Sequence, residues 1–185
     1  EKVAAILPTN VTAFGDGLEH RPADVLLYVT LRECAHHRLY QHAPWLRGAL
    51  VNAIEEFGRG TRLDMSGIES KLAGLDPTEI TTALEGGLFE PERTPEQQAA
   101  VDRLETLLAF IEGWVDEVVS QATRDTMPAA AALAEAMRRR RAAGGPAEQT
   151  FASLVGLELR PRRLRDASTL FAALRDRFGA DARDA

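Results

Sequence analysis

The 185-residue sequence predicts a mainly α-helical protein with about seven or eight helices and little or no sheet. Apolar residues recur at helical spacing over several long stretches, whereas no stretch shows the strict alternation that is typical of a half-buried strand. Helix start signals precede these stretches, and glycines follow them. A chain of this length can bury a core without disulfide bonds, so we expect a single domain over residues 1–185.

The first half of the chain is expected to form four helices. Asn10 can cap a short helix that runs to residue 14. Pro22 suits the first turn of a second helix, which should run to about residue 40. Pro44 opens a third helix, and Gly58 and Gly60 end it. A short helix over residues 76–86 should follow.

The second half begins with the clearest start signal in the sequence. Thr94 can cap a helix whose first residue is Pro95, and Gln97 completes a capping box. The apolar pattern continues to about Gln121, which makes this the longest helix and the central one. Two further helices are expected over residues 127–141 and 164–178, with at most a short extended piece at 157–160. We expect residues 181–185 to form a frayed tail.

Charge and hydropathy exclude several functional classes. The formal net charge of −6 gives no general attraction to nucleic acid or to anionic lipid, and we expect neither as a partner. Two arginine clusters, at 138–141 and 160–165, are interpreted as solvated or as pairing between segments. No apolar run approaches the roughly 20 residues that span a bilayer, and residues 1–7 are too short for a signal peptide. With Cys34 as its one cysteine, the chain is expected to be cytoplasmic. Its start at Glu1 leaves open that it belongs to a longer chain.

The histidines carry the most unusual pattern, because all four lie between His20 and His42. On a helix, Arg32 and His36 point the same way, and Glu33 flanks them. This is the spacing of His-Glu-x-x-His, in which two imidazoles bind zinc and the glutamate activates a water. His42 stands where a longer version of the motif has a third ligand, but that version requires glycine at the position of Leu39.

Five segments, in this order and spacing, resemble a bacterial family of zincin-like metallopeptidases: 7–11 (LPTNV), 31–36 (LRECAH), 44–47 (PWLR), 111–115 (IEGWV) and 156–163 (GLELRPRR). The resemblance implies a zincin-like helical domain and zinc-dependent peptide hydrolysis. It also implies that Glu33 is the catalytic base and that His36 and Glu112 are metal ligands. The first ligand position falls on Arg32.

Arg32 departs from the family pattern in a way that affects the chemistry. A guanidinium stays protonated and offers no lone pair to a metal. Our hypothesis is that Arg32 takes over the electrostatic role of the metal and pairs with Glu112, with Glu33 nearby. We therefore expect no bound metal, or zinc if the site is still competent. The function predicted is that of a metallopeptidase or hydrolase with a degenerate site and weak or lost catalysis. The alternative is a non-catalytic scaffold that binds a peptide or protein partner in the cleft.

Several of these residues also fit other roles. His42 is more typical of a residue that caps helix carbonyls than of a substitute ligand. Cys34 is expected in the core, and Trp45 and Trp114 are expected as core or lining residues. Asp116, one turn beyond Glu112, could orient a neighbour. A di-iron bundle needs a second Glu-x-x-His pair, which the sequence lacks. A small-molecule enzyme is a third possibility, but no phosphate-binding glycine loop supports it.

Overall fold

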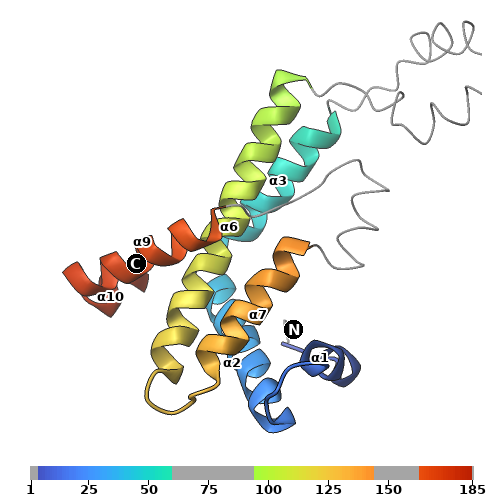
Figure 1. Ribbon diagram of the computed structural model, residues 1–185. Helices are drawn as coiled ribbons and strands as arrows, with labels where there is room; N and C mark the ends of the chain where they lie inside the picture. The colour runs from blue at the N-terminus through green and yellow to red at the C-terminus, as the bar shows by residue number, and fades with distance from the viewer. Residues whose placement is uncertain (1–3, 60–93, 144–162, 185) are drawn as a thin grey trace, which may run out of the picture.

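The computed structural model describes residues 4–59, 94–143 and 163–184, which form seven helices and no strand (Figure 1). This confirms the mainly α-helical class within the described residues. The helix expected over 76–86 and the extended piece at 157–160 lie outside these residues. None of the helices described is long and apolar enough to cross a membrane.

The first two helices are α1 (Pro8–Gly15) and α2 (Pro22–His42). Each has proline in its first turn, where the missing N–H has no intrahelical partner to lose. Helix α2 extends two residues beyond the predicted end. Its buried face points towards the rest of the protein and contains one charged residue among apolar ones: Val25, Tyr28, Arg32, Ala35 and Leu39.

Helix α6 (Pro95–Thr123) is the longest element and the axis of the fold, as predicted. The capping box at its start is present, with the Thr94 hydroxyl accepting from the backbone N–H of Gln97 and the Gln97 side chain accepting from that of Thr94. Helix α3 (Trp45–Arg59) lies along the first half of α6, whereas α2 lies against its second half (Figure 1).

The remaining helices are α7 (Ala130–Ala143), α9 (Leu164–Phe178) and α10 (Ala180–Asp184). Helix α9 crosses α6 very closely at Gly113, where an added Cβ would lie 2.5 Å from the Cβ of Ala167. Only a glycine permits this approach. Helix α7 returns along α6 and also contacts α2 (Figure 1).

The expectation of a frayed tail was wrong for residues 181–184, which belong to α10. Arg183 is buried there and donates to the side-chain oxygen of Gln121 at 2.7 Å. Asp184 accepts from the indole nitrogen of Trp114 at 3.1 Å. These contacts reach residues some 60 to 70 positions earlier, and no local pattern in the last five residues could have indicated them.

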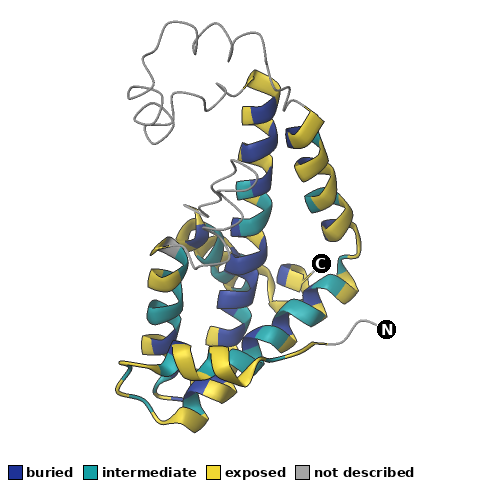
Figure 2. Cartoon of the chain, turned by 90° about the vertical axis from the view of Figure 1, so that its right-hand side faces the viewer, coloured by how far each residue is buried: buried dark blue, intermediate teal, exposed yellow. Residues whose placement is uncertain are grey.

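Buried residues run along α6 and the sides of the helices that face it (Figure 2). Of the expected core residues, Trp114 is buried with 4% of its surface exposed. The prediction of a core position was wrong for Cys34, which is exposed, and Trp45, expected as a core or lining residue, is 59% exposed and so is not in the core. Both lie on sides of their helices that face away from α6, and composition alone does not say which side that is.

Candidate functional site

The candidate site lies between α2 and α6 and is centred on Arg32. The guanidinium donates through Nη2 to Glu112 Oε2 at 2.6 Å and through Nη1 to Asp116 Oδ1 at 2.7 Å. Only 3% of the Arg32 side chain is exposed. Glu112 and Asp116 are one turn apart on α6, so both reach the same fork of donors. The predicted pairing of Arg32 with Glu112 is confirmed, and Asp116 orients Arg32.

His36 lies one turn after Arg32 and is joined to the same cluster. Its Nε2 is 3.0 Å from Glu112 Oε1, and its Nδ1 is 2.9 Å from the backbone oxygen of Arg32. A ring nitrogen that makes a hydrogen bond to an oxygen acceptor offers an N–H there, not a lone pair. His36 and Glu112 are thus brought together, as the resemblance implied, with a hydrogen bond between them.

Two arginines of α7 complete the cluster. Arg141 forms an ion pair with Glu112 Oε1, and Arg138 donates to Asp116 Oδ2 at 2.7 Å. The arginine cluster at 138–141 was interpreted as solvated or as pairing between segments, and pairing is what these two residues do. Their role at the site was not foreseen, because the end of α7 carries four consecutive arginines that no local signal distinguishes.

The surroundings of Glu112 strongly favour its ionised form. Burial by itself would raise the pKa of this carboxyl group, but the hydrogen bond from His36 and the charges of Arg141 and Arg32 lower it to about 2. Burial together with the charge of Glu112 raises the pKa of Tyr40. Glu112 is therefore a buried anion that is held by cationic partners from two other helices.

The other two predicted site residues, Glu33 and His42, are not bonded to this cluster. Among the described residues, no hydrogen bond or ion pair joins Glu33 to Arg32, His36 or Glu112. His42 is the last residue of α2, and its Nδ1 lies 2.9 Å from the backbone oxygen of Arg38. That contact agrees with its predicted capping role. Tyr28 is buried and lies beside the guanidinium of Arg32. The sequence did not indicate this place at the site, because Tyr28 fits the apolar pattern of a core residue.

The residues at this site do not fit a catalytic zinc ion. Such a site needs three protein ligands and an open position for water. Within the described ranges, no three His, Cys, Asp or Glu side chains are grouped to hold a metal. The guanidinium of Arg32 occupies the position of the first ligand. Both oxygens of Glu112 already have partners, since Oε2 accepts from Arg32 and Oε1 is bonded to His36 and Arg141.

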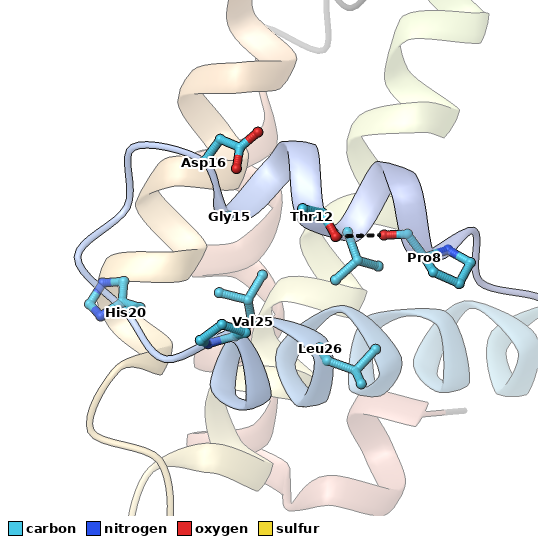
Figure 3. Close-up of a pocket in the computed structure, with 9 residues that line it drawn as sticks. Pro8, Thr12, Gly15, Asp16, His20, Val25 and Leu26 are labelled. Carbon is cyan, nitrogen blue, oxygen red and sulfur yellow. Dashed lines mark hydrogen bonds between the residues drawn. The ribbon is translucent and has the colours of Figure 1, made fainter.

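A separate pocket opens between α1 and the start of α2 (Figure 3). Its volume is about 280 Å³, and its walls are mostly apolar, with Val11, Val25 and Leu26 among them. Asp16 and His20 lie towards one end (Figure 3). None of the residues of the Arg32 cluster lines it.

Comparison with protein families identifies the class of protein that these features define. The sequence model of the zincin-like metallopeptidase family matches residues 1–185, and the chain belongs to this family. Comparisons with curated proteins and with solved structures find no match.

Proposed function

We propose that this chain is a zincin-like metallopeptidase relative with a degenerate metal site, in which peptide hydrolysis is weak or lost. The observation that carries the proposal is the position of Arg32, 2.6 Å from Glu112 and 3% exposed. A buried guanidinium there occupies the ligand position without a lone pair and adds a positive charge that repels a second cation.

The glutamate of the motif is still in its place on α2, three positions before His36. In an active zincin this glutamate activates the water on the metal. The proposal therefore depends on the ligand lost at Arg32, because without a metal Glu33 has no metal-bound water to activate.

Zinc titration tests the proposal. Isothermal titration calorimetry on the purified, chelator-treated protein should show no zinc binding at micromolar concentrations. One-to-one binding below micromolar, lost in His36→Ala but kept in His42→Ala, would refute it. His42→Ala is the matched control, because it removes an imidazole of the same helix whose described contact is with a backbone carbonyl only.

Activity is measured on the same preparations. A quenched fluorescent peptide library should be cleaved no faster by the zinc-supplemented protein than by its Glu33→Gln variant. Cleavage that depends on Glu33 and is removed by a chelator would show that the machinery is intact after all.

The second candidate is non-catalytic binding of a peptide or protein partner, and the exposure of Trp45 favours it. Tryptophan with 59% of its surface exposed is unusual on a monomer surface and frequent at the centres of interfaces. Peptide display on the whole protein should select sequences whose binding is lost in Trp45→Ala. Selection that enriches no sequence, or binders that tolerate Trp45→Ala, would contradict this candidate.

A further inference from the structure

We propose that two arginines from different helices, Arg32 on α2 and Arg141 on α7, together replace the metal at Glu112. The family's metal position has thereby become an ion-pair clamp that joins α2, α6 and α7. This inference rests on the proposed function, since it assumes that zinc is not bound.

The two oxygens of Glu112 are held from two sides. Oε2 accepts from Arg32 of α2 at 2.6 Å, and Oε1 is paired with Arg141 of α7 and lies 3.0 Å from His36 Nε2. Two guanidinium groups carry the same charge as one zinc ion. The arginines hold the carboxylate by donating N–H hydrogen bonds to its oxygens, whereas a zinc ion would be coordinated directly by a carboxylate oxygen.

Asp116 repeats the arrangement one turn further along α6. Its Oδ1 accepts from Arg32 at 2.7 Å, and its Oδ2 accepts from Arg138 of α7 at 2.7 Å. Each of the two carboxylates on α6 is therefore bridged between Arg32 of α2 and one arginine of α7. The two arginines of α7 are three positions apart and lie on one face of the helix, which matches the one-turn spacing of the carboxylates.

This arrangement has a consequence for restoring the metal site. Arg32→His returns the missing ligand, but it leaves the positive charge of Arg141 on Glu112 Oε1. We expect R32H to bind zinc weakly and R32H/R141Q to bind it about 10- to 100-fold more tightly, the range by which groups that contact a ligand alter metal affinity. The matched control is R32H/R139Q, which removes an equal charge from an exposed neighbour on α7 that contacts neither carboxylate.

Zinc affinity is measured by competition with a chromophoric chelator, and folding by circular dichroism. Tighter binding by R32H/R141Q than by both R32H and R32H/R139Q supports the inference. Equal affinity of R32H and R32H/R141Q, or no binding by either folded variant, overturns it. Zinc binding by the unaltered chain would instead overturn the proposed function, so the two failures are distinguishable.

A second measurement covers the case in which R32H does not fold. In the otherwise unaltered protein, R141Q should lower the melting temperature by about 4 °C, because buried Glu112 loses one of the two arginines that hold it. R139Q should leave it within about 1 °C. Equal melting temperatures of R141Q and R139Q would overturn the clamp.

Discussion

Replacing Arg32 by methionine separates the contribution of its charge from that of its packing. Methionine keeps an unbranched apolar stem of similar length but removes both hydrogen bonds, those to Glu112 Oε2 at 2.6 Å and to Asp116 Oδ1 at 2.7 Å. Removal of one partner from a buried pair costs about 3–5 kcal/mol, because the other partner remains as a buried charge. Glu112 keeps His36 and Arg141, so we expect the lower limit, about 3 kcal/mol.

The assay is urea unfolding at neutral pH, followed by circular dichroism. A loss of about 3 kcal/mol corresponds to a fall in melting temperature of roughly 6–12 °C for a chain of this length. Arg38→Met is the control, since Arg38 lies on the same helix but its side chain is 63% exposed, and its ion pair with Asp184 is long, at 4.0 Å. Its effect should be under about 1 kcal/mol.

The pH dependence of the same variant tests the electrostatic origin of the effect. The pKa of Glu112 is lowered from 4.5 to about 2 in the folded protein. A carboxyl group with a depressed pKa stabilises the fold above its unfolded value, and this contribution disappears as the pH falls from 4.5 to about 2. A shift of this size corresponds to about 3 kcal/mol. In R32M the pKa of Glu112 is lowered less, because the charge of Arg32 is gone, so part of this stabilisation is already lost at neutral pH. The difference in stability between R32M and the unaltered protein should therefore narrow as the pH falls from 4.5 to about 2.

Two results would refute this reasoning. A stability of R32M equal to that of Arg38→Met would mean that the buried hydrogen bonds contribute nothing net. A gap between R32M and the unaltered protein that stays constant down to about pH 2 would mean that the loss comes from packing, not from charge.

Three further predictions concern the scaffold around the site. Gly113→Ala should destabilise the protein by about 1–3 kcal/mol in urea unfolding, because the added Cβ would lie 2.5 Å from the Cβ of Ala167. Gly48→Ala is the control and should stabilise the protein by up to about 1 kcal/mol, because a Cβ at that position of α3 meets nothing within 4 Å. Equal effects of the two substitutions would contradict the close crossing of α6 and α9. Thr94→Ala should cost about 1 kcal/mol by the same measurement, since it removes the capping hydroxyl of α6, and an unchanged stability would show that the cap is not needed. Glu117→Gln should lower the melting temperature by roughly 2–8 °C, because buried Glu117 loses its ion pair with Arg175 of α9, whose side chain is 16% exposed. A shift below about 1 °C would show that this pair is screened by solvent.

Much of the fold could be predicted from local signals. The start of α6 followed from the capping box at Thr94, and the bounds of α9 followed from its apolar spacing. These features act between residues three or four positions apart, so the sequence displays them directly. The short helix α10 could not be found in this way, because the contacts of Arg183 and Asp184 with α6 hold it in place.

The candidate site was predictable in part. The motif spacing placed Arg32 and His36 on one face of α2, and the family resemblance indicated Glu112 as their partner. Neither source pointed to Arg138 or Arg141, because four arginines in a row offer no local difference. The choice among them depends on which face of α7 lies against α6.

The sequence by itself determined the helical class, the main helix starts, the family and the presence of arginine at the ligand position. These depend on residue chemistry and on spacing within one helix. Only the tertiary structure decided what the arginine does. It brings Arg32 to Glu112, 80 positions away, and adds Arg141 on the other oxygen of the same carboxylate. The physical reason is that the balance of charge in a buried cluster depends on every helix that packs against it. The local sequence of one helix does not determine which other helices pack there.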